Sequence, residues 1–462
     1  MPQAEEHAEE EHSEAHPGRD AEDDLHQPGG RLGRFIRNLE YVEKWLLLGL
    51  VVGVIAGIGA VVFYLALKYT GQFLLGHIAG YHMPAPLGEG GSKGSSHYDR
   101  PWALPLVTTA GALVSALIVA KFAPEASGHG TDSAIEAIHT DPRHIRSRVV
   151  LVKMISSALT IGSGGSGGRE GPTAQISAGF ASMLTRRLHL SDADGRILVS
   201  LGIGAGIGAI FGAPLGGAVL AASIIYRDDF EYRTLYPGFV TSATAYAVFG
   251  SFMGFDPMFG YVDAEYRFED AGPLLWFVVL GVVAATVGYL FARIFYATGT
   301  LTARLPGGRV LKPTLGGLLV GLLGLAIPQI LSSGYGWVQL ATTKEALATI
   351  PLWVVLVLPI AKIVATSLSI GTGGSGGIFG PGIFVVVGMM ACFGSVAHAP
   401  LAVLIMVAEM TGSFSVVPGA IIAVGIASLL MYRTKVSIYH AQRLNRETAE
   451  AERQNADAAR FR

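Results

Sequence analysis

The chain has few charged residues and almost no cysteine. Charged residues make up 15% of its 462 residues, whereas soluble globular proteins carry about 25%. Its one cysteine, Cys392, has no second cysteine with which to form an intrachain disulfide, and its apolar sequence surroundings indicate an inert packing role. These shortages argue against a soluble globular protein and exclude an intrachain disulfide framework.

Long apolar runs take the place of charge. Hydrophobic residues make up 51% of the chain, and the mean hydropathy is +0.47. Apolar segments of about the length that crosses a bilayer, roughly 17–25 residues, recur along most of the sequence. Examples are 45–67, 104–119, 274–292, 313–331 and 352–368. We expect roughly ten spans or partial spans joined by short loops, and therefore one all-α polytopic membrane domain.

Charge is concentrated at the two ends. Residues 1–30 are rich in Glu, Asp and His, which predicts a disordered acidic tail rather than a metal site. No signal-peptide pattern opens the chain. Basic residues precede the first span: Arg31, Arg34, Arg37 and Lys44. The positive-inside rule therefore puts the N-terminus in the cytoplasm of a protein of the inner membrane. We expect a membrane domain over 31–441 and a short polar tail over 442–462, with no regulatory domain appended.

An eleven-residue motif occurs twice. GSGGSGGREGP occupies residues 162–172 and GTGGSGGIFGP occupies residues 371–381, with eight of eleven positions identical and a separation of 209 residues. Each copy is followed by a second shared element, GAPLGG at 212–217 and HAPLAV at 398–403. Internal repeats of this kind in membrane transport proteins place the substrate site between the halves, at broken helices.

Each copy has the composition of unwound backbone that leads into a helix. Glycine permits backbone conformations that other residues avoid. Pro172 and Pro381 suit the first turn of a helix, where the missing N–H costs nothing. Irregular backbone at membrane depth is tolerated only where protein buries it or where it lines a cavity. Helix N-termini present free N–H groups and a partial positive charge, so two converging ends predict an anion site.

Other interpretations of the motif explain less. Close helix packing accounts for one glycine-rich run, but not for two copies that each end in Gly-Pro. A phosphate-binding loop needs a Lys–Ser/Thr ending, which neither copy has. GGSG at 164–167, with His398 as a base, resembles the nucleophile motif of rhomboid intramembrane proteases. Its recurrence at 373–376 argues against a catalytic serine, so we expect no enzyme activity.

These residues resemble the CLC family of chloride channels and proton-coupled chloride transporters, in its prokaryotic form without CBS domains. GREGP at 168–172 matches the family's gating-glutamate motif, and GIFGP at 377–381 matches its second anion-binding motif. GHG at 128–130 stands where the family usually has Gly-Ser-Gly. Tyr439, within KVSIYHA, stands where the family has its pore tyrosine. The resemblance covers residues 34–441.

The resemblance implies a CLC-like fold of two internal repeats with broken helices and re-entrant half-helices, assembled as a homodimer with one pore per subunit. The implied anion-binding residues are His129, Arg169, Gly171, Ile378, Phe379 and Tyr439. Glu170 is implied to be the gate. When ionised it occupies the outer anion site, and when protonated it swings away, so that the pore opens or a proton is carried. An intramembrane carboxylate is functional by default; the alternative is that Glu170 only pairs with Arg169.

Two substitutions depart from the family's pattern. His129 replaces the central-site serine, and it either donates a hydrogen bond to the anion or packs without touching it. Ile224, beside Ser223, replaces the inner proton-transfer glutamate. Isoleucine cannot carry a proton, so we expect a passive chloride channel gated by Glu170. The alternative is a chloride–proton exchanger with an inner route through water or His129.

The second half of the chain is shorter than the first. Pro172 and Pro214 are 42 residues apart, but Pro381 and Pro400 are only 19 apart, so about a helix and a half is missing. A missing crossing puts the position of Tyr439 in question and leaves a non-conducting, scaffold-like relative as a further alternative.

We expect chloride or a similar anion such as fluoride or nitrate as cargo, protons and membrane lipid as partners, and no cofactor, metal or nucleic acid. Glu409, in the second half, is expected to be a structural carboxylate.

Overall fold

The structure is a computed structural model. It describes residues 31–95, 97–260, 272–341, 351–378, 386–415 and 417–460. Helices dominate these residues, and their only β-pairing consists of isolated bridges. The expected all-α membrane architecture is therefore confirmed. The acidic tail, Phe379 and Pro381 lie outside the described residues.

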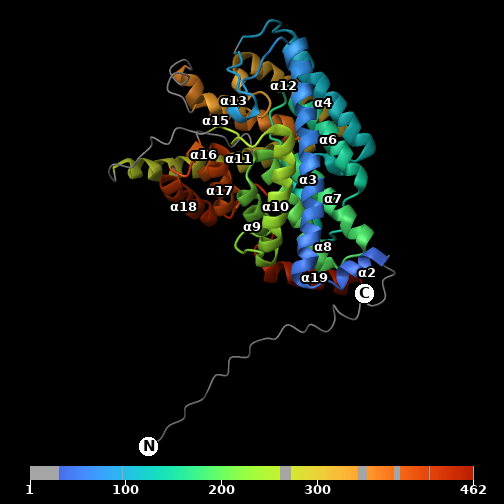
Figure 1. Ribbon diagram of the computed structural model, residues 1–462. Helices are drawn as coiled ribbons and strands as arrows, with labels where there is room; N and C mark the ends of the chain where they lie inside the picture. The colour runs from blue at the N-terminus through green and yellow to red at the C-terminus, as the bar shows by residue number, and fades with distance from the viewer. Residues whose placement is uncertain are drawn as a thin grey trace, which may run out of the picture.

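The first half of the chain forms α2 to α10, drawn from blue to green in Figure 1. Its elements are α2 Arg31–Arg37, α3 Tyr41–Gly71, η2 Gln72–Ile78, η3 Leu87–Glu89, α4 Ala103–Phe122, η4 Pro124–Ala126, α5 Thr131–His139, α6 Ser147–Gly162, α7 Glu170–Leu188, α8 Asp192–Phe211, α9 Pro214–Ser223 and α10 Tyr232–Met253. The long helix α3 runs along α10 and α8.

The second half forms α11 to α18. Its elements are α11 Gly272–Arg304, α12 Gly308–Ala326, η5 Pro328–Ile330, α13 Tyr335–Ala341, α15 Leu352–Thr366, η6 Ser367–Gly371, α16 Val386–Val396, α17 Pro400–Thr411 and α18 Val417–Thr434. A last helix, α19 Arg446–Arg460, lies at the lower end of the molecule in Figure 1. Arg446 of α19 forms an ion pair with Glu231, 3.2 Å apart.

Seven helical segments of the described chain are long and apolar enough to cross a membrane. They are Tyr41–Ile78, Ala103–Phe122, Asp192–Phe211, Leu274–Arg304, Gly308–Ala326, Trp353–Gly371 and Val417–Thr434. The helices α9 and α17 are apolar but have only 10 and 12 residues. At about 1.5 Å per residue, each reaches only about half of the ~30 Å hydrocarbon core. They are therefore half-helices rather than spans.

A carboxylate joins the two half-helices. Glu409 of α17 accepts the backbone N–H of Leu215 at 3.0 Å through Oε1, and that of Gly216 at 2.8 Å through Oε2. The first N–H groups of a helix have no acceptor within the helix, and the helix dipole favours a negative charge there. Glu409 thus caps α9, in agreement with the structural role expected for it.

The two glycine-rich copies have the same backbone form and bind each other. Gly164 and Gly373, the third residue of each copy, have φ values of 106° and 105°, which glycine adopts readily. Further along, Gly168 N–H donates to the carbonyl of Gly377, and Gly377 N–H donates to that of Gly168, both at 2.7 Å. Main-chain hydrogen bonds therefore connect the two halves of the protein at the repeated motif itself.

The repeat extends to a buried lysine in each half. Lys153 in α6 and Lys362 in α15 each precede the glycine-rich copy by nine residues. Lys153 Nζ donates to two carbonyls of the loop 126–128, at 3.1 and 2.7 Å. Lys362 Nζ donates to two carbonyls of the loop 330–332, at 2.9 and 2.8 Å. Each lysine thus fixes a loop that leads toward the repeated motif, a role that sequence analysis missed.

The second repeat is shortened as expected. In the first half, two helices of 19 and 20 residues, α7 and α8, stand between the glycine-rich copy and the half-helix. In the second half, the described residues of this interval hold only α16, which has 11 residues. The helix α16 packs against α11, α17 and α18, so this half still forms a continuous packed unit.

Candidate functional site: a buried carboxylate where the repeats meet

Glu170 is the first residue of α7, and it is only 1% exposed. A Cβ atom on Gly377 would lie 2.5 Å from Glu170 Oε1, and a Cβ atom on Gly168 would also overlap the carboxylate. The phenols of Tyr335 and Tyr439 both interact electrostatically with this carboxyl group. The structure therefore places the predicted gate at the junction of the two copies, in a space that only glycine leaves open.

His129 and Tyr439 come together from distant parts of the chain. Their ring centroids lie 5.8 Å apart, and both residues are buried. The segment before His129 pairs with the second copy, because Gly128 N–H donates to the carbonyl of Gly374 at 2.8 Å. The carbonyl of His129 in turn closely approaches Gly171 at the start of α7. The short second repeat therefore leaves Tyr439 beside the predicted site.

Asp132 holds the imidazole of His129. Its Oδ2 lies 3.1 Å from His129 Nε2, and its Oδ1 accepts the backbone N–H of Ala441 at 3.1 Å. The hydroxyl of Tyr296 lies 3.3 Å from the same Oδ2. His129 Nδ1 is buried and has no hydrogen-bond partner among the residues that the structure describes. Sequence analysis missed Asp132, although its i,i+3 spacing from His129 was a usable signal.

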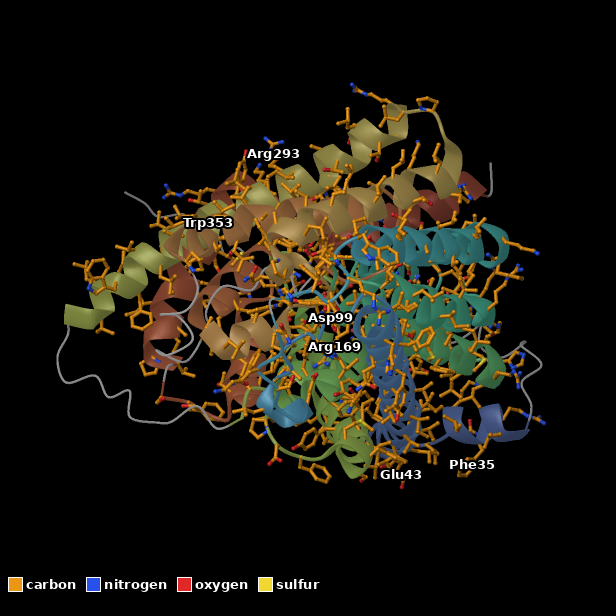
Figure 2. All side chains as sticks on the ribbon, turned by 90° about the horizontal axis from the view of Figure 1, so that it is seen from above. Phe35, Glu43, Asp99, Arg169, Arg293 and Trp353 are labelled. Atoms are coloured by element: carbon orange, nitrogen blue, oxygen red, sulfur yellow. The ribbon has the colours of Figure 1, made fainter. Side chains whose placement is uncertain are left out.

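Arg169 is held by a carboxylate at the end of η3. Its guanidinium lies 2.6 Å from Glu89 and is buried. Three aromatic rings surround it at 5.1–5.6 Å from their centroids, those of Tyr64, Phe211 and Tyr335. Figure 2 shows Arg169 near the middle of the molecule when viewed from above. The arginine predicted to bind the anion is therefore a partner of Glu89, a residue that sequence analysis did not single out.

A cavity of about 700 Å³ adjoins this arginine. It is lined by Glu89, Arg169 and Tyr335 together with parts of the loops 81–86 and 331–337. Because Tyr335 also faces the Glu170 carboxyl group, the cavity leads from the loop side of the molecule to the neighbourhood of Glu170. The positive guanidinium in its wall favours anions there, although its pairing with Glu89 weakens that attraction.

The inner proton position is apolar. Ile224, directly after α9, is fully buried, and the Ser223 hydroxyl donates to a backbone carbonyl of its own helix at 3.0 Å. A titratable side chain close to it is His139, at the end of the non-spanning helix α5. Its Nε2 lies 3.2 Å from the carbonyl of Ile225, and its ring faces Tyr226 at 5.7 Å. Burial lowers the pKa of His139 to about 4, so it is neutral near neutral pH.

The other predicted residues have simpler surroundings. Gly171 is the second residue of α7, where N–H groups have no acceptor within the helix. Ile378 is buried beside Gly377, and Phe379 lies outside the described residues. The serine and histidine of the protease interpretation are engaged elsewhere. The Ser166 hydroxyl shares a hydrogen bond with Thr366 at 3.0 Å, and His398 Nε2 lies 3.1 Å from the carbonyl of Val436.

The fold and the site together define a membrane transport protein in which two repeats meet around a buried carboxylate and the start of a helix. The sequence profile of the voltage gated chloride channel family matches residues 111–385 and 380–432. The chain belongs to this family, the CLC family that its motifs resemble. Anion transport across membranes is accordingly its general activity.

Relatives and solved structures agree with this assignment. A putative chloride channel protein ClcB-like from Ralstonia nicotianae is 31% identical over 349 residues, 68% of this chain and 79% of the relative. An H(+)/Cl(-) exchange transporter ClcA from Salmonella arizonae is 28% identical over 451 residues, 87% of this chain and 89% of the relative. A slow cyanobacterial Cl-/H+ antiporter has a TM-score of 0.71 at 23% identity, covering 86% of this chain and 96% of that chain. A CLC-type fluoride/proton antiporter also has a TM-score of 0.71, at 21% identity, covering 87% of this chain and 98% of that chain.

Replacing Gly377 with alanine should displace the Glu170 carboxylate. The new methyl group would lie 2.5 Å from Oε1, so the side chain must leave its position. We expect chloride efflux from proteoliposomes to lose most of its pH dependence, because the displaced carboxylate no longer competes with the anion. Gly425→Ala is the matched control, since nothing lies within 4 Å of a Cβ atom there. A wild-type pH profile in Gly377→Ala would contradict the position assigned to the carboxylate.

Proposed function

We propose that this protein exchanges chloride for protons across the inner membrane and that Glu170 is the group both ions use. One observation carries the proposal: the Glu170 carboxylate is buried at the first turn of α7, where the two repeats meet. The N–H groups and dipole of a helix start attract an anion, so the ionised carboxylate acts as a tethered anion there. Once protonated, it loses this attraction and yields the position to chloride.

Exchange replaces the passive channel as the main hypothesis. Ile224 predicts uncoupled flow, but a relative named as a proton/chloride exchange transporter aligns over 87% of this chain. Two of the similar solved structures are also named as antiporters. The site further contains His129 and Asp132, a titratable pair in contact. A passive channel remains the alternative, and the buried Ile224 is the observation in its favour.

Chloride is the cargo that this proposal assigns, and fluoride is the second candidate. One relative is named for chloride exchange and one similar structure for fluoride exchange. The residue that distinguishes this site is His129, which stands where a serine is expected. Its Nδ1 can donate a hydrogen bond to an anion only when it carries a proton. Anion preference should therefore be measured for chloride, fluoride and nitrate in the same vesicles.

We also propose that the N-terminus lies in the cytoplasm. A further proposal is that two copies associate through the half-helices. Leu215 of α9 is 49% exposed and Leu401 of α17 is 56% exposed, on two half-helices that pack against each other and are too short to span. A second copy covering this face would keep their polar helix ends away from lipid. Light scattering in detergent should give a protein mass of two 48.5 kDa chains. A mass of one chain would contradict the dimer.

Chloride flow should drive protons uphill in proteoliposomes. With an outward chloride gradient and no pH gradient, we expect chloride to leave and protons to enter at a fixed ratio, because both ions depend on the Glu170 position. The measurement pairs a chloride electrode with a pH electrode. Chloride efflux without proton movement would contradict exchange and support the passive channel. If vesicles with well-folded protein release neither chloride nor fluoride nor nitrate, the result would support the non-conducting, scaffold-like alternative.

Glu170→Gln should keep anion flow and abolish proton coupling. Glutamine resembles the protonated carboxyl group but can neither release a proton nor compete as an anion. We expect chloride efflux to remain within about tenfold of the wild type, a change of about 1.4 kcal/mol in barrier, and to lose its pH dependence. Glu409→Gln is the control, because it neutralises a carboxylate that only caps α9. Proton coupling should be preserved in this variant. Retained coupling in Glu170→Gln would place the gate elsewhere.

A further inference from the structure

We infer that Asp132 and His129 form the inner proton relay of this protein, in place of the carboxylate that is absent at residue 224. The inference rests on the proposed exchange of chloride for protons. It follows from the direct contact of an accessible carboxylate with a buried imidazole, whose second nitrogen lacks a partner among the described residues.

The outer end of the relay is the Asp132 carboxylate. Its side chain is 26% exposed, whereas that of His129 is 7% exposed, so water reaches the carboxylate more readily than the imidazole. The backbone N–H of Ala441 fixes Oδ1 at 3.1 Å and leaves Oδ2 toward the imidazole. When Oδ2 carries a proton, the Tyr296 oxygen at 3.3 Å and His129 Nε2 at 3.1 Å are both within reach of it.

The inner end of the relay is His129 Nδ1. An imidazole can take up a proton on one nitrogen and release one from the other. Here Nε2 faces the carboxylate, and Nδ1 lies inside the protein next to Tyr439, whose ring is 5.8 Å from the imidazole. Tyr439 in turn interacts with the Glu170 carboxyl group. The imidazole therefore stands between the accessible carboxylate and the proposed gate.

The proton passes through Asp132 and His129 in two transfers. Water protonates Asp132 at Oδ2, and this proton moves to Nε2 of a neutral His129 that already carries a proton on Nδ1. The imidazolium then releases the Nδ1 proton toward Glu170, by way of water that the Tyr439 hydroxyl can hydrogen-bond. One proton has entered and one has left, while Asp132 is ionised again. The ring must change its tautomer before the next cycle.

Charged and titratable groups surround this pair on every side. Lys153 of α6 binds the carbonyl of Gly128, next to the imidazole, and Glu170 of α7 lies beyond Tyr439. Tyr296 of α11 stacks on the exposed His440 ring, with centroids 3.5 Å apart. Arg227, after α9, acts on His440 through its charge.

These neighbours determine how the relay depends on pH. Burial raises the pKa of Asp132, but the His129 ring, the Ala441 N–H and His440 lower it by more, so the net shift is downward. Asp132 is therefore ionised near neutral pH, and its protonation from the surface is infrequent. Coupled exchange should become faster as the pH on the Asp132 side falls toward the acidic range.

A second buried histidine provides the matched control. His139 ends the same helix, lies against the carbonyl of Ile225 and is close to the apolar residue 224. It therefore sits beside the expected proton position. None of the described contacts of His139 leads to Tyr439 or Glu170, whereas those of His129 do.

The experiment measures protons moved per chloride in proteoliposomes of full-length protein. The variants are Asp132→Asn, Asp132→Glu, His129→Ser and His139→Gln. We expect Asp132→Asn and His129→Ser each to lower the ratio by about tenfold or more, since a positioned proton-transfer group contributes about 10²- to 10⁴-fold. Chloride flux should persist in Asp132→Asn. Asp132→Glu should restore part of the coupling, and His139→Gln should keep the wild-type ratio.

Three outcomes would overturn the relay. The first is a wild-type ratio in Asp132→Asn or His129→Ser. The second is a parallel fall of both fluxes at a constant ratio, which would assign these residues a structural role. The third is loss of coupling in His139→Gln alone, which would place the proton route at His139, at the C-terminal end of α5. Failure of the exchange proposal looks different, because wild-type protein would then conduct chloride without moving protons at all.

Discussion

The reciprocal hydrogen bonds between Gly168 and Gly377 are the interaction on which the rest of the site depends. They fix the two repeats to each other through main-chain atoms, at 2.7 Å in each direction. Any side chain at these positions would meet the Glu170 carboxylate, so the same glycines that permit the contact also shape the space for the acid. The start of α7, the segment before His129 and the second copy are all positioned relative to this contact.

The two copies contribute differently to the site. The first supplies a carboxylate and a guanidinium, whereas the described part of the second supplies backbone from Gly374 to Gly377 and the Ser375 hydroxyl, which donates to the carbonyl of Ala126 at 3.1 Å. Backbone hydrogen bonds do not depend on side-chain identity. This division explains how the second half can be shortened, with an 11-residue α16, while the carboxylate, His129 and Tyr439 still come together.

Sequence patterns predicted the membrane class, the repeat and Glu170, because long apolar runs and a duplicated glycine motif are local signals. They missed Asp132, since an acid in a first turn is also typical of an ordinary helix start. Glu89 and Arg169 pair across 80 residues of chain, which no local spacing reveals. Ile224 is apolar and buried as expected, but the relatives named as exchangers favour the alternative drawn from the sequence, an exchanger whose inner proton route avoids that residue.

The two buried lysines have a consequence for the stability of the protein. Lys153 and Lys362 bind only carbonyl oxygens, and within the described chain neither has a carboxylate partner. A buried charge without a counter-ion costs several kcal/mol. An anion near His129 would offset part of this cost, because Lys153 binds the adjacent carbonyl. Loss of either amine would release a loop that leads toward the repeated motif, so the two lysines connect the stability of the fold to the geometry of the site.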